Sequence, residues 1–313
     1  MTAIRKLCLA FIGLAAASGA PALAADKPDK VSFYFAAHED DWQLFMNPSA
    51  FQDVLDGASK TVFVYVTAGD AGLGTGRGGR RWPYYRAREN GAQDAVRFMA
   101  DTDHEPARRA ESRIALNRHN IFRVEYRNTV SYFLRVPDGN IKGEGFEDTG
   151  YQSLLRLRKG AIPTMAAVDG STVYRGWDDL VQTVRAIIDA ERGYTPLIQI
   201  NVAETDPAIH PDDHADHLMT AQAALDAAKD MPCVRRVSYV DYHSAKLPEN
   251  LNAQQRDMES SVFAVTLAGV QAFDHGTSWR HYDGSYVGRN YFRVQEAPGS
   301  CMLPASRVAT ARR

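Results

Sequence analysis

Two short stretches of the chain carry side chains with the potential for catalysis. The stretch HPDDHADH, residues 210–217, holds three of the nine histidines and three aspartates. The stretch AAHEDD, residues 36–41, adds His38, Asp40 and Asp41. Imidazole nitrogens and carboxylate oxygens are the groups from which metal sites and proton-transfer sites are built. The first question is therefore whether these two stretches meet in the folded chain.

Both stretches follow a segment with the pattern of a buried β-strand. VSFYF, starting at residue 31, precedes the first stretch, and TPLIQINVAE, residues 195–204, precedes the second. A further apolar strand pattern, residues 61–70, follows the first after a segment long enough for a short helix. Strand, helix and strand in this order favour a βαβ unit and a parallel sheet. Because ligands gather at the carboxyl ends of strands in such a sheet, the two stretches are expected to converge there.

The rest of the chain continues to alternate between helix and strand patterns. We expect strand material at 119–139, a late strand from residue 234, and helices at 84–101, 178–193, 218–230 and 260–274. No internal repeat or linker is evident. The sequence therefore predicts an α/β fold with a mostly parallel sheet in a single domain.

The glycine-rich stretch GLGTGRGG, residues 72–79, contains a formal G-x-G-x-x-G pattern after a predicted strand. A dinucleotide-binding turn needs these glycines to open a helix directly. Here Pro83 restricts Trp82 to an extended conformation before the next helix. The stretch is therefore interpreted as a loop beside the site.

The two stretches together offer a plausible metal-ligand set. One supplies a histidine and a carboxylate, and the other supplies a second histidine. Two nitrogens, one carboxylate oxygen and an open position suit catalytic Zn²⁺, and also Fe²⁺ or Co²⁺.

The N-terminus has the pattern of a secretory signal peptide. Arg5 and Lys6 precede an apolar run, and small residues at 22–24 predict cleavage after Ala24. Residues 1–24 are therefore predicted to be removed, which leaves a single domain at 25–313 and a secreted or periplasmic protein. No later stretch is long and apolar enough to cross a bilayer.

Charge and cysteine content narrow the function further. The formal net charge is −2, and it becomes −4 without the two basic residues of the signal peptide. This weakly acidic balance gives no electrostatic reason to expect a nucleic-acid partner. Cys233 and Cys301 remain after cleavage, and in an oxidising compartment they are candidates for a disulfide.

The two stretches also resemble the motifs of a known family. AHEDD resembles the AHPDD signature of the PIG-L (LmbE-like) family of zinc-dependent N-acetylglucosaminide deacetylases, and HADH, residues 214–217, resembles its second motif. TAGDAG, YRARE and FLRVPDG follow in the family's order, so the resemblance runs from about residue 31 to residue 230. It implies a Rossmann-like three-layer sandwich.

The resemblance implies roles for individual residues. His38, Asp41 and His217 match the metal ligands, and Asp40 matches the general base. His214 matches a histidine that polarises the carbonyl or donates a proton.

Further positions receive supporting roles. Asp216 is a candidate for holding His214 or a ligand histidine in the required tautomer. Arg86 resembles a substrate-binding arginine, and His210 is interpreted as a residue of the approaching loop. Asp212 or Asp213 is a candidate cap for the helix that follows.

The chain departs from the family pattern at two positions. Glu39 stands where the family commonly has proline, and Trp42 stands where an acidic residue usually follows the aspartate pair.

The resulting expectation is a secreted metal-dependent hydrolase. It removes an N-acetyl group from an acetamido sugar or glycoconjugate with a metal-activated water. Two alternatives remain open at this point: a carbohydrate-binding protein without turnover, and a non-haem Fe(II) oxygenase that uses the same two histidines and one carboxylate.

Overall fold

The structure is a computed structural model that describes residues 28–301, so the predicted signal peptide lies outside the described residues. The described chain forms one eight-stranded sheet and a separate strand pair, β6 (Met165–Ala166) and β7 (Val173–Tyr174). In sheet order, the eight strands are β10 (Phe292–Gln295), β9 (Val234–Tyr239), β8 (Leu197–Ala203), β1 (Lys30–Ala36), β2 (Ser59–Thr67), β5 (Thr129–Val136), β4 (His119–Tyr126) and β3 (Ala110–Leu116).

The centre of the sheet is parallel and its edges are antiparallel. β9, β8, β1, β2 and β5 run in the same direction, whereas β10 at one edge and β4 and β3 at the other run against their neighbours. β1 pairs with β2 on one side and with β8 on the other. The strands that precede the two motifs are therefore direct neighbours, as expected.

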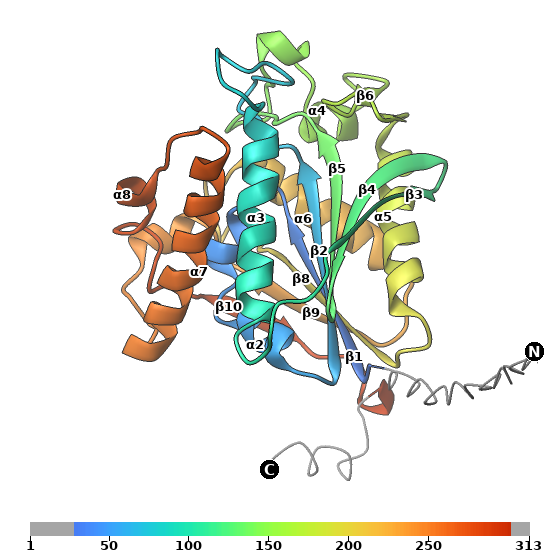
Figure 1. Ribbon diagram of the computed structural model, residues 1–313. Helices are drawn as coiled ribbons and strands as arrows, with labels where there is room; N and C mark the ends of the chain where they lie inside the picture. Colours follow the sequence, from blue (N-terminus) through green and yellow to red (C-terminus); the bar gives the residue numbers. More distant parts are fainter. Residues whose placement is uncertain (1–27, 302–313) are drawn as a thin grey trace, which may run out of the picture.

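Helices cover both faces of the sheet (Figure 1). One face carries α1 (Asp41–Phe45), α2 (Ser49–Leu55), α3 (Tyr84–Ala100), α7 (Ala253–Ala272) and α8 (Trp279–Tyr282). The other face carries α4 (Leu154–Arg158), α5 (Trp177–Arg192) and α6 (Ala215–Ala228). This arrangement confirms the three-layer α/β fold with a mostly parallel sheet.

Alternation along the strands builds a separate core on each face. In β1, Phe33 and Phe35 pack with α5 and α6, whereas Tyr34 and Ala36 pack with α3 and α7. All four side chains are buried, because a strand between two helical layers has no solvent-facing side. This explains why the strand segments are nearly continuous apolar runs.

The glycine within α3 has a packing role. A Cβ atom at Gly91 would lie 2.4 Å from the backbone oxygen of Thr266 in α7, and a Cβ at Gly269 would lie 2.7 Å from the Cα of Gly91. The two helices therefore cross at a point where only glycine fits on both sides.

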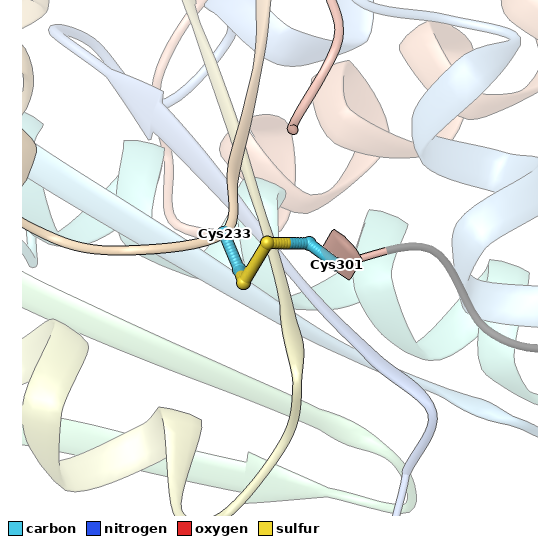
Figure 2. Close-up of a disulfide and its surroundings, with 2 residues drawn as sticks. All are labelled: Cys233 and Cys301. Atoms are coloured by element: carbon cyan, nitrogen blue, oxygen red, sulfur yellow. A yellow bond between two sulfur atoms is a disulfide. The ribbon is translucent and has the colours of Figure 1, made fainter. Parts of the chain in front are cut away.

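The C-terminal part of the described chain is fastened to the sheet in two ways. β10 pairs with β9, and a disulfide joins Cys233, just before β9, to Cys301 (Figure 2). The expected pairing of the two cysteines is thus present. Within residues 28–301, no helix is both long enough and apolar enough to span a membrane.

Candidate metal centre

The side chains of both sequence motifs meet in one cavity at the carboxyl ends of the parallel strands. His38, Asp40 and Asp41 follow β1, and His214 and His217 lie at the start of α6, after β8. The cavity has a volume of about 260 Å³. It is lined by His38, Asp40, Asp41, Leu44, Phe45, Ala71, Tyr84, Arg88, Asp138, Asn140, Ile141, Phe146, His214, Tyr242 and Tyr282.

The structure brings the three predicted metal ligands within reach of one ion. His38 Nδ1 lies 3.2 Å from His217 Nε2, and Asp41 Oδ1 lies 3.4 Å and 3.2 Å from these two nitrogens. Zinc bonds of about 2.0–2.2 Å in tetrahedral geometry separate ligand atoms by about 3.3 Å. The three donor atoms therefore form a triangle of the size that a tetrahedral cation requires.

Two of these three side chains, Asp41 and His217, are positioned by contacts on the side away from the triangle. The backbone N–H of His38 donates to Asp41 Oδ2 at 2.7 Å, which leaves Oδ1 directed at the two imidazoles. His217 Nδ1 lies 3.1 Å from Asp213 Oδ2 and 3.3 Å from Asp241 Oδ2. A carboxylate on the far nitrogen fixes the ring and directs the other nitrogen toward a metal.

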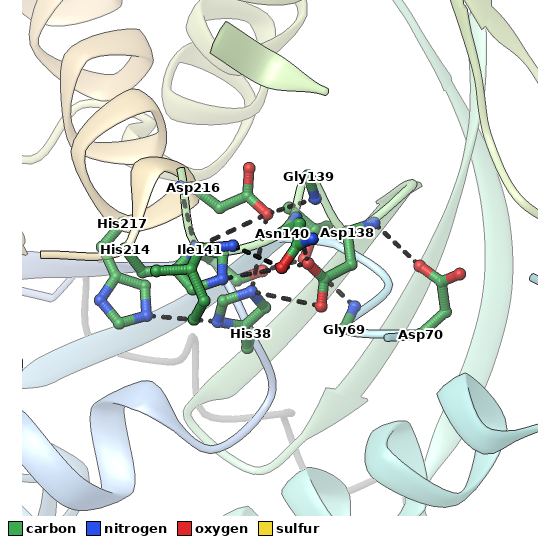
Figure 3. A network of polar contacts seen from close by, with 12 residues as sticks. His38, Gly69, Asp70, Asp138, Gly139, Asn140, Ile141, His214, Asp216 and His217 are labelled. Atoms are coloured by element: carbon green, nitrogen blue, oxygen red, sulfur yellow. Dashed lines mark hydrogen bonds and ion pairs between the residues drawn. The ribbon is translucent and has the colours of Figure 1, made fainter. Parts of the chain in front are cut away.

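The opposite side of His38 faces a second group of carboxylates (Figure 3). His38 Nε2 lies 3.7 Å from Asp216 Oδ2 and 3.8 Å from Asp138 Oδ2. The backbone N–H of Gly139 donates to Asp216 Oδ2 at 2.7 Å. Asp216 thus lies beside His38, at an ion-pair distance and outside hydrogen-bond range.

His214 begins α6 as its N-cap. Its Nδ1 accepts the backbone N–H of Asp216 at 3.1 Å, so the expected cap at Asp212 or Asp213 is wrong. Asp213 is instead buried against His217. Because Nδ1 is an acceptor, the proton of a neutral His214 lies on Nε2, the nitrogen 4.0 Å from Asp138 Oδ1.

The electrostatics of the site favour a bound cation. Burial acts to lower the pKa of His38, but the neighbouring Asp41, Asp216 and Asp138 raise it to about 10. Burial also acts to lower the pKa of His217. The carboxylates of Asp213 and Asp41 outweigh it and raise that pKa well above its usual range. Carboxylates that attract protons to imidazoles also attract a metal ion. Five buried aspartates surround the histidines: Asp41, Asp138, Asp213, Asp216 and Asp241.

Asp40 lies at the cavity outside the ligand triangle. Its carboxylate is paired with the guanidinium of Arg88, from α3. Arg88 also lies 3.3 Å from Glu39 Oε2 and donates to the backbone oxygen of Gly69 at 3.0 Å. Glu39, the residue at the family's proline position, is therefore a buried partner of an arginine that lines the cavity.

Arg86 does not line the cavity. Its guanidinium donates to Glu89 at 2.7 Å and lies 5.6 Å from the centre of the Phe122 ring. Glu89 in turn receives two bonds from buried Arg135, at 2.5 Å and 2.9 Å. The motifs YRARE and FLRVPDG are thus joined by a buried ion pair, and Arg88 supplies the cavity arginine in place of Arg86.

The other motif pieces also have identifiable contacts. Asp70, in TAGDAG, accepts the backbone N–H of Asp138 at 2.8 Å and that of Gly74 at 2.7 Å. It therefore joins the glycine-rich loop to the loop after β5. Ala71, just before that loop, and Tyr84, the first residue of α3, line the cavity. Trp42 is buried and donates to the Tyr65 hydroxyl at 2.8 Å.

Several site residues were not singled out from the sequence. Asp138 and Asp241 each lie just after a parallel strand. The rule that ligands gather at the carboxyl ends of parallel strands therefore applies to them as well. Arg88, Tyr84 and Tyr242 carry no comparable local signal. Their place at the cavity depends on how helices and the C-terminal segment pack.

The comparisons with known proteins agree with this geometry. Residues 33–228, more than half of the chain, match the family described as PIG-L: GlcNAc-PI de-N-acetylase. The chain belongs to the PIG-L family. The family match covers His38, Asp40, Asp41, His214 and His217, and it confirms the resemblance seen in the sequence. PIG-L membership supports a deacetylase, a hydrolase that acts on amides.

Two further comparisons complete the description of this PIG-L chain. A solved structure of N,N′-diacetylchitobiose deacetylase from Pyrococcus horikoshii, complexed with its inhibitor MPG, is similar over 86% of this chain and 84% of that chain. The identity is 12% and the TM-score is 0.46. A comparison with curated proteins gave no match.

Proposed function

We propose that the protein is a secreted, metal-dependent N-deacetylase that acts on an acetamido sugar or a glycoconjugate. The observation that carries this proposal is the donor triangle of His38, Asp41 and His217, of which His38 and Asp41 line the same cavity as Asp40. Two imidazoles and one carboxylate, with an open side toward a cavity, form the donor set of a catalytic zinc site. Fe²⁺ or Co²⁺ would accept the same donors.

The residues present fit such a metal. When bound, a divalent cation supplies a Lewis acid that polarises an amide carbonyl and makes water a competent nucleophile near neutral pH. Asp41 and the two histidines would hold it, and Asp213 and Asp241 keep His217 in the ligand orientation.

Asp40 is the candidate general base. Its carboxylate lines the cavity, adjacent in sequence to Asp41, and is paired with Arg88. A carboxylate in this position can accept a proton from the attacking water. Arg88 holds that carboxylate in place, and we assign to Arg88 the substrate-binding role first expected of Arg86.

His214 is suited to stabilise negative charge as it develops on the carbonyl oxygen. Burial and the charges of His38 and His217 lower the pKa of His214 to about 3, so its imidazole is neutral at ordinary pH. Its Nδ1 is already an acceptor, and the remaining Nε2–H is the donor available to the cavity. We therefore assign it carbonyl polarisation by this N–H.

The proposed secretion has separate support. The sequence predicts a signal peptide at residues 1–24. The Cys233–Cys301 disulfide is a second argument, because such bonds are typical of oxidising compartments. Mass spectrometry of the exported protein is expected to give Ala25 as its first residue. An intact N-terminus in the cytoplasmic fraction would contradict export.

The function is tested by acetate release from N-acetyl sugars, polysaccharides and lipid-linked sugars. Dialysis against a chelator is expected to abolish release, and added Zn²⁺ is expected to restore it. Activity that survives chelation would refute the metal role. Sugar binding without acetate release would support the binding protein instead, and Fe²⁺-dependent oxygen consumption would support the oxygenase.

A further inference from the structure

Part of the cavity wall comes from outside the part of the chain that matches the family. The family match ends at residue 228, whereas Tyr242 and Tyr282 line the cavity together with His38 and Asp40. Tyr242 opens a short 3-10 helix (Tyr242–Lys246) just after β9, and Tyr282 ends α8. The segment after α6 therefore contributes directly to the surface that a substrate meets.

These tyrosines form one continuous aromatic surface with Tyr286. The rings of Tyr242 and Tyr286 are stacked with centres 5.6 Å apart, and those of Tyr282 and Tyr286 lie 5.8 Å apart. Tyr286 is buried, but Tyr242 and Tyr282 are only half-buried. We call these three residues the C-terminal aromatic wall. Its middle ring supports two outer rings that keep free surface at the cavity.

The wall is fastened to the body of the protein close to the site. Asn290 Nδ2 donates to the backbone oxygen of Phe45, at the end of α1, at 2.9 Å. The backbone N–H of Gly288 donates to buried Glu259 of α7 at 2.6 Å. The Tyr286 ring also packs edge-on against the Phe45 ring, 5.2 Å away. Because these contacts hold Tyr286 and the segment just after it to α1 and α7, the wall is positioned before substrate arrives.

The wall extends from the metal ligands to the candidate base. The Tyr242 ring lies 4.9 Å from the ring of His217. At the other end, Tyr282 lines the same cavity as Asp40. A substrate whose amide lies between the ligands and Asp40 would therefore place the atoms next to that amide against the wall.

We propose that Tyr282 is a specificity-determining residue that packs its ring on the apolar face of the substrate's sugar ring. Aromatic side chains offer a large rigid surface with a polar tip, and the C–H face of a pyranose is an apolar surface of matching shape. The C-terminal aromatic wall then selects cyclic acetamido sugars over acyclic amides. This inference rests on the proposed function, since it concerns the substrate of the same site.

The test measures binding separately from turnover. In a metal-loaded Asp40→Asn background, calorimetry follows the binding of N,N′-diacetylchitobiose and of the acyclic amide N-acetylethanolamine. Tyr282→Ala is expected to weaken binding of the disaccharide about tenfold, the scale of losing one aromatic contact. Tyr282→Phe, which keeps the ring, is expected to remain within about threefold, and neither variant should change the weak binding of the acyclic amide.

A matched control is Tyr194→Ala, at a tyrosine that is 91% exposed and does not line the cavity. It is expected to bind the disaccharide like its parent, and thermal unfolding of all variants shows whether each is folded. Equal losses for Tyr282→Phe and Tyr282→Ala would assign the effect to the hydroxyl and overturn the ring-packing proposal. An unchanged Tyr282→Ala, or a parent that binds no disaccharide, would also overturn it.

The same proteins separate this inference from the proposed function. If the enzyme with Asp40 intact releases no acetate from any sugar while the binding pattern holds, the deacetylase proposal fails and the wall proposal stands. If acetate is released and Tyr282→Ala leaves the KM for the disaccharide unchanged, the wall proposal fails alone.

Discussion

Asp40 and Asp41 are adjacent in the chain, but their carboxylates face different partners. Asp41 is buried, with Oδ1 directed at two imidazole nitrogens and Oδ2 held by a backbone N–H. Asp40 is paired with Arg88 and lies outside the donor triangle. Replacing each aspartate in turn by a neutral residue therefore tests metal binding and proton transfer separately.

At the residue scale, we expect Asp41→Asn to lose metal and Asp40→Asn to keep it. Removal of a positioned general base lowers the rate by about 10²–10⁴-fold. Metal content by mass spectrometry and acetate release after incubation with Zn²⁺ measure the two effects. Loss of metal from Asp40→Asn, with Asp41→Asn still loaded, would mean that the two roles are exchanged.

The sequence predicted much of this site because histidines and carboxylates at strand ends can be found by local pattern alone. His38 and His217 were expected to converge, and their nitrogens do lie together. Arg86 shows the limit of that reasoning. Arg86 and Arg88 are two positions apart on a helix, so their side chains point to different sides, and the sequence does not reveal which side faces the cavity.

At the scale of elements, the crossing of α3 and α7 depends on a pair of glycines. Both helices were expected from their patterns, but the reason for Gly91 was not, because its partner Gly269 is far away in the sequence. Strand and helix types follow from local periodicity, whereas contacts between distant helices are set by the packing of the whole chain.

We expect Gly91→Ala to destabilise the protein, although alanine is the better helix former. The new methyl group would meet the backbone oxygen of Thr266, which no side-chain rotation can move, and overpacking of this kind costs about 1–3 kcal/mol. The free energy of unfolding in urea measures the change. Gly57→Ala is the control, since a Cβ there meets nothing within 4 Å. A Gly91→Ala protein as stable as the control would contradict the close crossing.

At the scale of the whole molecule, the disulfide closes the C-terminal part of the chain onto the sheet. Cys233 and Cys301 are 68 residues apart, and the segment between them contains α7, α8 and the C-terminal aromatic wall. A cross-link over such a length restricts the unfolded chain considerably. The wall is therefore part of a closed loop that begins beside β9 and returns to it.

A reductant is accordingly expected to lower the unfolding free energy, by at most about 4 kcal/mol for a loop of this length. Unfolding in urea with and without a thiol-free reductant measures the loss. The double variant Cys233→Ser with Cys301→Ser should already show the lower stability and should not respond to the reductant. An equal response of the double variant would show that the effect does not come from this bond.

Both ends of the described chain lie on the side of the sheet where the parallel strands begin. Residue 28 lies just before β1, and Cys301 is bonded to Cys233 just before β9, so both ends lie by the amino ends of parallel strands. The cavity lies at the carboxyl ends of those strands. An affinity handle or a solid support attached at residue 28 or at residue 301 would thus lie on the side of the sheet away from the cavity. Immobilised in this way, the enzyme would present its open side to a polymer too large to diffuse.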